Sequence, residues 1–148
     1  MMLIFKGRAV LPGTVEGHTL VTRRGFNTYA SFFTSIHERT GKAVCADSDN
    51  PDLYGRDLAG AIICLPRTTG STSSGAVWQR LAGWDITPRA MLFSQQIDPL
   101  AAGGLLVADM WAGKRVVTID RLGDEFLNTV QSGDKISVSA AGQVVIYK

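Results

Sequence analysis

Residues 59–75, Ala-Gly-Ala-Ile-Ile-Cys-Leu-Pro-Arg-Thr-Thr-Gly-Ser-Thr-Ser-Ser-Gly, decide the fold. The first seven residues, 59–65, are almost all apolar and end at a proline, which predicts a short buried strand. Beyond Gly70, apolar residues recur at helical spacing as far as about Gly83, and the serines and threonines before them are good helix caps. We therefore expect a strand, a loop and a helix in this order.

Strands and helices are expected to alternate along the rest of the chain. Short strands are predicted at 6–11 and 18–22, around the turn Pro12-Gly13. Residues 23–57 are long and irregular, and such a segment is usually functional or covered by a partner. The remaining predicted elements are strands at 90–94 and 115–119, a helix at 100–112, a short helix or turn at 120–131, and a terminal hairpin made of 134–139 and 143–147.

This order predicts one α/β domain over residues 1–148, with a mixed sheet of parallel and antiparallel strands and a C-terminal hairpin. The length of the chain agrees with a single domain. Two strand-to-helix crossings place loops at the carboxyl ends of parallel strands. Ligands commonly bind there.

Composition and charge exclude several classes of function. The net charge is only +2 and the basic residues are scattered, so we expect no nucleic-acid partner. The longest apolar stretch, 100–112, contains Asp109 and is too short to cross a bilayer. The N-terminus lacks the order of a signal peptide, so a cytoplasmic protein without a membrane partner is expected. The charged fraction of 19% is low, which favours a surface partly covered by another chain.

The cysteines and histidines predict no metal site in this chain. Cys64 lies in an apolar run and is expected to be a buried, inert thiol, whereas Cys45 lies in a polar region and is expected to be exposed. Two cysteines are fewer than an iron–sulfur cluster normally needs, so any such cluster would be held largely elsewhere. His18 and His37 stand alone, without the spacing of metal ligands.

The loop after the predicted strand 59–65 is a candidate anion site. Gly70 allows close approach to the backbone, and the first amides of the helix that follows have no internal partners. The guanidinium of Arg67 can form a bidentate pair of hydrogen bonds with a carboxylate or phosphate. Near Arg67 and these amides, the alkoxide of Ser71 would be stabilised and would accept a proton. From the residues alone, a flexible polar loop with several caps remains the alternative.

Several motifs resemble those of the small-subunit or swivel-domain part of aconitase X enzymes, over nearly the whole chain. The most specific is Pro66-Arg67 followed by Gly70-Ser71, combined with an upstream Ser31-Phe32. The other matching segments are Lys6-Gly7-Arg8-Ala9-Val10, Val15-Glu16-Gly17, Thr40-Gly41, Gly55 to Gly60, and Ala101-Ala102-Gly103.

The resemblance implies a swivelling β/β/α domain of the aconitase type, which acts as the small subunit of a heteromeric hydro-lyase. It implies that Ser71 is the proton acceptor, and that the iron–sulfur cluster belongs to a cysteine-bearing large subunit without which this chain is inactive. The iron would act there as a Lewis acid. The residues that the resemblance places around the substrate are Arg67, Gly70, Thr72, Ser73, Ser31 and Phe32.

Three interpretations of the function follow. The preferred one is a cis-3-hydroxy-L-proline dehydratase. The second is a mevalonate 5-phosphate dehydratase, for which Arg23, Arg24 and Arg39 are candidate extra cations. The third is a non-catalytic binding module of swivel type. Family members read Ser-Phe-x-Gly-Gly-Val-Asp-Pro where this chain has residues 31–38, Ser-Phe-Phe-Thr-Ser-Ile-His-Glu. Without the two glycines, a different choice of substrate is expected.

Overall fold

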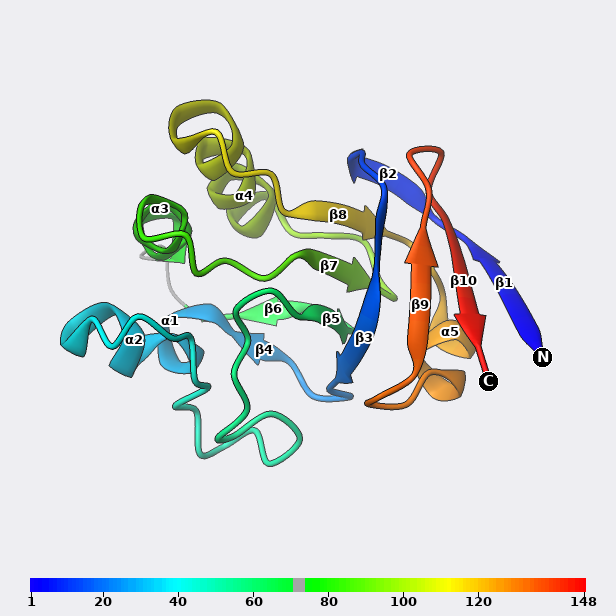
Figure 1. The fold of residues 1–148 in the computed structure, drawn as a ribbon, viewed down its shortest axis with the longest axis horizontal. Helices are drawn as coiled ribbons and strands as arrows, with labels where there is room; N and C mark the ends of the chain where they lie inside the picture. Colours follow the sequence, from blue (N-terminus) through cyan, green and yellow to red (C-terminus); the bar gives the residue numbers. More distant parts are fainter. Residues whose placement is uncertain (71–73) are drawn as a thin grey trace.

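The structure, a computed structural model, describes residues 1–70 and 74–148 (Figure 1). The strands are β1 (Met2–Lys6), β2 (Arg8–Leu11), β3 (Val15–Val21), β4 (Phe26–Asn27), β5 (Ile62–Leu65), β6 (Thr68–Thr69), β7 (Ala90–Phe93), β8 (Val117–Asp120), β9 (Lys135–Val138) and β10 (Gln143–Tyr147). The helices are α1 (Thr28–Ser31), α2 (Phe33–Glu38), α3 (Ser74–Gly83), α4 (Pro99–Ala112) and α5 (Asp124–Thr129).

The large sheet has the strand order β1-β10-β9-β3-β5-β7-β8-β2. Its four central strands, β3, β5, β7 and β8, run parallel, and the other pairs are antiparallel. The mixed sheet and the terminal hairpin β9–β10 confirm the predictions. The strands predicted on either side of Pro12-Gly13 exist but do not pair with each other, since β2 joins β8 while β3 joins β5 and β9.

The sheet curls strongly, and the strands at its two ends are consecutive in the chain. Its end strands, β1 and β2, are separated only by Gly7. The Gly7 amide donates to the Gly142 carbonyl at 2.9 Å, and a Cβ on Gly7 would lie 2.5 Å from the Asp120 carbonyl oxygen. Only glycine fits where the chain crosses from one end of the sheet to the other. The predicted first strand began at Lys6 and so missed β1.

The two faces of the sheet bury separate cores. Inside the curl lie apolar side chains of β5, β7 and β9, among them Ile62 and Leu92, with Phe126 of α5 packed among them. The helices α1 to α4 lie on the outer side of the sheet (Figure 1). Ile63 and Phe93 belong to the core cluster on this face. Strands β5 and β7 are buried on both faces, which explains their unbroken apolar sequences.

The segment 23–57 is more ordered than its sequence predicted. It contains β4, α1 and α2, and it buries Phe26, Phe32 and Leu53 in the outer core. The expectation that Cys45 is exposed is wrong, because its side chain is 1% exposed within this core. The apolar residues here reveal no period, because two short helices and long turns each contribute only a few of them.

No helix within residues 1–70 and 74–148 is both long and apolar enough to span a bilayer.

Candidate active site

The four parallel strands end at one edge of the sheet, and the candidate site lies in the loops that follow them. The loops after β5 and β7 are bonded to each other: the Ser94 amide donates to the Leu65 carbonyl at 3.0 Å, and the Gln95 amide to the Pro66 carbonyl at 3.3 Å. Carboxyl ends of parallel strands are the usual place for ligands in such sheets. We call the edge where the four parallel strands end the carboxyl edge. The loops after β5 and β7 lie there, as predicted.

The loop after β5 is held by a small sheet of its own. Strand β6 pairs in parallel with β4, and the Phe26 amide donates to the Arg67 carbonyl at 2.9 Å. Gly70 has a φ of +109°, and a Cβ there would lie 2.9 Å from the Asn27 side-chain oxygen. Gly70 is therefore required for close contact with Asn27 and for a backbone conformation that other residues rarely adopt.

Exposed arginines stand at this edge, among them Arg67 and Arg121. Arg67 follows β5 and Arg121 follows β8, and both side chains are exposed. The Arg121 amide donates to the Gln95 carbonyl at 3.0 Å, and its guanidinium donates to the side chain of Gln96 at 3.2 Å. The edge thus offers positive charge to an anionic ligand.

Ser71, Thr72 and Ser73 lie outside the described residues. The described chain stops at Gly70 and resumes at Ser74, where α3 begins. The predicted roles of these three residues stay predictions.

Ser31 and Phe32 are brought next to the loop. Asn27, which contacts Gly70, also caps α1, since its side chain accepts from the Ala30 amide at 3.1 Å. Both predicted side chains are nevertheless fully buried. The Phe32 ring packs edge-on against Trp78 with a centroid distance of 5.5 Å. Packing is the role that the structure gives Phe32, and its contact with a substrate stays a prediction, as does that of Ser31.

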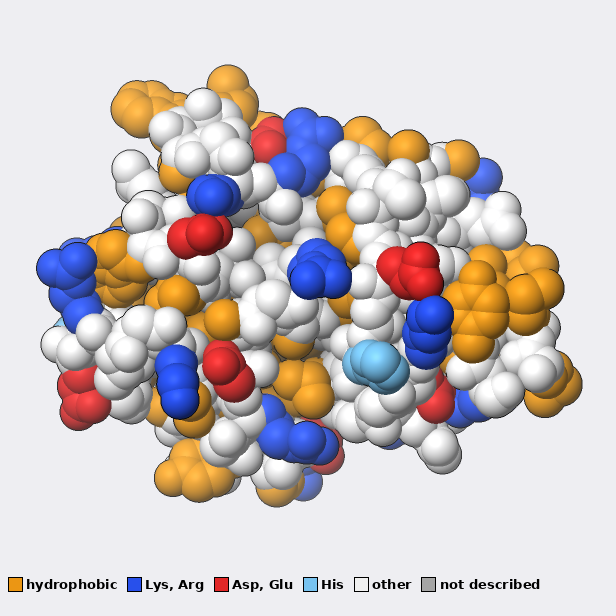
Figure 2. All heavy atoms as spheres, viewed as in Figure 1, with side chains coloured by type: hydrophobic (Ala, Val, Ile, Leu, Met, Phe, Trp, Pro, Cys, Tyr) orange, Lys and Arg blue, Asp and Glu red, His pale blue; other side chains and the backbone are white. Residues whose placement is uncertain are grey.

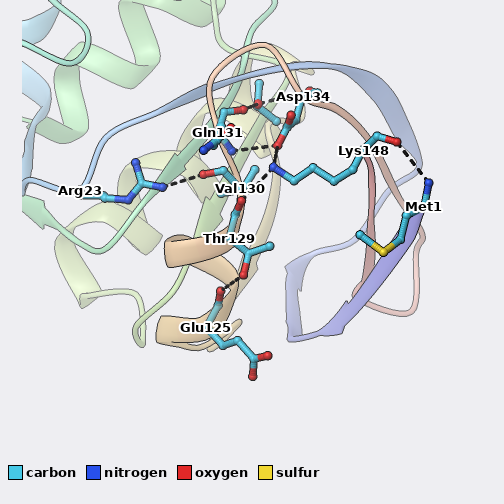
Figure 3. Close-up of polar contacts among 9 residues, drawn as sticks. Met1, Arg23, Glu125, Thr129, Val130, Gln131, Asp134 and Lys148 are labelled. Carbon is cyan, nitrogen blue, oxygen red and sulfur yellow. Dashed lines mark hydrogen bonds and ion pairs between the residues drawn. The ribbon is translucent and has the colours of Figure 1, made fainter.

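Two of the candidate extra cations, Arg23 and Arg24, also follow a parallel strand at this edge, whereas Arg39 does not. Arg23 follows β3, and its guanidinium donates to the Val130 carbonyl at 2.8 Å (Figure 3). Arg24, beside it, is exposed. The guanidinium of Arg39 lies 4.8 Å from the ring centroid of Trp84, beyond the C-terminal end of α3. Because α3 starts at the carboxyl edge and ends near the opposite edge, Arg39 does not join the site.

The family match covers almost the entire chain. Residues 4–146 match the aconitase X swivel domain. The chain belongs to this family. This swivel domain is 30% identical over 141 residues to the phosphomevalonate dehydratase small subunit of Methanothrix thermoacetophila, covering 95% of this chain and 92% of that protein. It is also 30% identical to the protein of the same name from Thermococcus kodakarensis, covering 97% and 96% of the two chains.

A solved structure supports the same assignment. Aconitase X of Thermococcus kodakaraensis, in its holo form, superposes on the swivel domain with a TM-score of 0.79 and 26% identity, over 99% of both chains. The predicted swivel fold is confirmed, and the swivel domain is the small subunit of a dehydratase, a component of a hydro-lyase.

The described residues of the swivel domain do not fit an iron–sulfur cluster. The described part of the chain contains no group of three His, Cys, Asp or Glu side chains that would hold a metal. Cys45 lies in the outer core and Cys64 inside the curl of the sheet, so the two thiols face different cores. Burial raises the pKa of each thiol, which disfavours the thiolate that ligates iron.

Two carboxylates at the carboxyl edge escaped the sequence analysis. Asp98 accepts a hydrogen bond from the Thr68 hydroxyl and caps α4 by accepting from the Ala101 amide at 3.0 Å. Asp120 is fully buried and accepts two hydrogen bonds from Arg8, at 2.9 and 2.7 Å. The pair Asp98-Pro99 was a local signal for a helix start, with a cap followed by a first-turn proline. No local signal marked the contacts with Thr68 and Arg8.

Proposed function

We propose that the swivel domain is the small subunit of a phosphomevalonate dehydratase and that Ser71 is its proton acceptor. The observation that carries the proposal is the likeness, over more than nine-tenths of the chain, to small subunits of that name. The exposed Arg67 and Arg121 at the carboxyl edge support it, because a substrate with a phosphate and a carboxylate needs cationic partners.

In the proposed reaction, the residues of this chain bind the anion and remove a proton. Arg67 and the N-terminal amides of α3 hold the carboxylate of the substrate. The Ser71 alkoxide takes the proton from the carbon next to that carboxylate. The C–H electron pair becomes the new carbon–carbon double bond, and the hydroxyl on the neighbouring carbon departs with its bonding pair as hydroxide. A proton from solvent converts this hydroxide to water, and Ser71 returns its proton to solvent. Arg67 and the amides also favour the alkoxide form of Ser71.

The rest of the active site is proposed to come from a cysteine-bearing large subunit that carries an iron–sulfur cluster, in the cytoplasm. The surface of α4 supports a covering partner. Its sequence has one charged residue, Asp109, yet five large apolar side chains are exposed on it: Leu100, Leu106, Val107, Met110 and Trp111. Figure 2 shows hydrophobic side chains gathered over α4, at the upper left. A helix that is apolar on several faces is normally covered.

A second candidate substrate is cis-3-hydroxy-L-proline, and one observation favours it. The segment where family members have two glycines is the helix α2 here, and it ends at Arg39 in a left-handed conformation. Without the two glycines, this segment presents a different surface beside α1, which favours a substrate of another shape than that of the enzymes to which the named relatives belong.

The test is an elimination assay on the complex. The swivel domain is co-expressed with the cysteine-bearing large subunit from the same genome, and turnover is measured on mevalonate 5-phosphate and on cis-3-hydroxy-L-proline. Ser71→Ala should lower kcat by about 10²–10⁴ fold, the usual contribution of a general base, with the complex intact. The exposed Ser48→Ala is the matched control.

Turnover of mevalonate 5-phosphate alone supports the proposal, whereas turnover of the hydroxyproline alone replaces it with the second candidate. Normal turnover by the Ser71→Ala complex, or no elimination from either substrate by an intact wild-type complex, overturns it.

A further inference from the structure

Thr68 and Asp98 connect the loop after β5 to the start of α4. They are 30 positions apart in the sequence, and the Thr68 hydroxyl donates to one oxygen of the Asp98 carboxylate. The other carboxylate oxygen accepts from the Ala101 amide at 3.0 Å and so caps α4. A helix cap needs only one side-chain oxygen. The second oxygen of Asp98 is therefore available to bind the loop.

Thr68 lies within the loop itself, so its contact with Asp98 acts directly on the position of the loop. It lies between Arg67 and Gly70, and three residues before Ser71. In the described structure, the backbone of residues 66–70 is held by the pairing of β6 with β4 and by bonds from the Phe26 and Gln95 amides, and the contact with Asp98 adds a side-chain anchor. A hydrogen bond to a carboxylate is stronger and geometrically tighter than one between neutral groups.

The position of Asp98 is in turn set by contacts of the preceding residue with the sheet. The amide of the preceding residue, Ile97, donates to the Asp120 carboxylate at 2.9 Å. Asp120 is buried and gripped by the Arg8 guanidinium through both of its oxygens. The chain therefore enters α4 at a position set by β8 and β2, two strands of the rigid sheet.

We propose that Asp98 is a positioning residue for the reaction: through Thr68 it holds residues 67–70, which include Arg67 and lead to Ser71, in the arrangement that proton removal requires. This inference rests on the proposed function of Ser71. The sheet sets the position of Asp98, and the hydrogen bond from Thr68 to Asp98 sets the position of Thr68. The position of Thr68 then sets that of the neighbouring residues in β6 and of Gly70. A displacement of about 1 Å at a reacting group costs on the order of 10²-fold in rate.

The experiment compares variants of Thr68 in the complex with the large subunit. Thr68→Val keeps the shape and removes the hydroxyl, and it should lower kcat by about 10–100 fold while KM changes by less than about threefold. Thr68→Ser keeps the hydroxyl and should restore kcat. Thr129→Val is the matched control, because it removes a hydroxyl that donates to the Glu125 carbonyl at 2.7 Å, away from the loop.

Asp98→Ser separates positioning from capping. Serine caps helices about as well as aspartate, but its single oxygen cannot serve α4 and Thr68 together. Asp98→Ser should lower kcat to the same degree as Thr68→Val, and the double variant should lower it no further, because the two residues share one interaction. Amide hydrogen exchange should quicken in residues 67–70 in both variants and stay unchanged in 103–112.

The outcomes separate this inference from the proposed function. If Ser71→Ala abolishes turnover but Thr68→Val turns over normally, the positioning role is wrong and the function of Ser71 stands. If Thr68→Ser fails to restore kcat, or if the effects of Thr68→Val and Asp98→Ser add, the positioning role is also wrong. Normal turnover by Ser71→Ala overturns the proposed function instead, and the exchange data then still report whether Asp98 anchors the loop.

Discussion

The two ends of the chain and the carboxyl edge of the parallel strands use their charged residues differently. At the chain ends, Lys148 donates to the Asp134 carboxylate at 2.6 Å and to the Thr129 carbonyl at 3.0 Å, and the Met1 amino group donates to the Lys148 carbonyl at 3.2 Å (Figure 3). At the carboxyl edge, Arg67 and Arg121 are exposed beside loops. The first region uses its charges to close the fold, and the second leaves them exposed, where the proposed anionic substrate would bind.

The largest expected effect is the difference in kcat/KM between variants of Arg67, whose guanidinium is exposed, and of Arg23, whose guanidinium is bonded within the fold. Arg67→Gln should lower kcat/KM of the complex by about 10²–10³ fold, since the guanidinium proposed to hold the substrate anion through two hydrogen bonds is lost. Arg67→Lys should recover only part of this loss, because lysine cannot form such a bidentate pair. Steady-state kinetics on the co-expressed complex measure both.

Arg23→Gln is the control for this pair, because its guanidinium is already bonded to the Val130 carbonyl. Its kcat/KM should stay within about twofold of wild type. An equal loss in both variants would show that Arg23 also binds the substrate, and the contrast between a guanidinium bonded within the fold and an exposed one would fail.

A variant of Asp120 tests whether a charged side chain at the carboxyl edge stabilises the fold. Asp120→Ala leaves the Ile97 amide without its acceptor and Arg8 without its partner. The free energy of unfolding should fall by about 2–4 kcal/mol, the usual loss when a buried hydrogen-bonded carboxylate is removed. Chemical denaturation of the chain measures it, with the exposed Asp124→Ala as control. A change below about 0.5 kcal/mol, the usual range for a surface substitution, would contradict this role.

Lys148 gives the smallest expected effect. Burial alone would raise the pKa of Asp134, but hydrogen bonds from Lys148 and from the Gln131 amide outweigh it and lower that pKa. A lowered pKa in the folded state stabilises the fold above the unfolded value, near pH 4, and this stabilisation is lost as the pH falls through the folded value. Lys148→Met should therefore lower the stability by at most about 1 kcal/mol at pH 7, with a smaller difference at pH 3.

Thermal melts of the wild type and of Lys148→Met at the two pH values test this prediction. The exposed pair of Lys135 and Glu16, at 3.0 Å, provides the control Lys135→Met. A larger difference between wild type and Lys148→Met at pH 3 than at pH 7 would reverse the expected sign and refute the role given to Asp134.

Local patterns were enough for the central strands, the two long helices and the hairpin. The unbroken apolar runs of β5 and β7 and the alternation in β9 and β10 are properties of a few neighbouring residues. The loop with Arg67 and Gly70 was also found from its own residues. The two-residue strands β4 and β6 could not be found in this way, because two residues have no detectable period and each is stabilised only by the other.

The sequence by itself determined which segments are buried strands, where α4 starts, and that a serine-rich loop follows a strand end beside an arginine. These features depend on hydrophobic periodicity, capping and backbone preferences, which act over a few residues. The tertiary structure decided that β1 and β2 close the sheet on either side of Gly7, that Arg8 grips Asp120 from 112 positions away, and that Asp98 holds Thr68. Such contacts form only once the whole sheet has folded, because their energy depends on burial and on partners that no local pattern specifies.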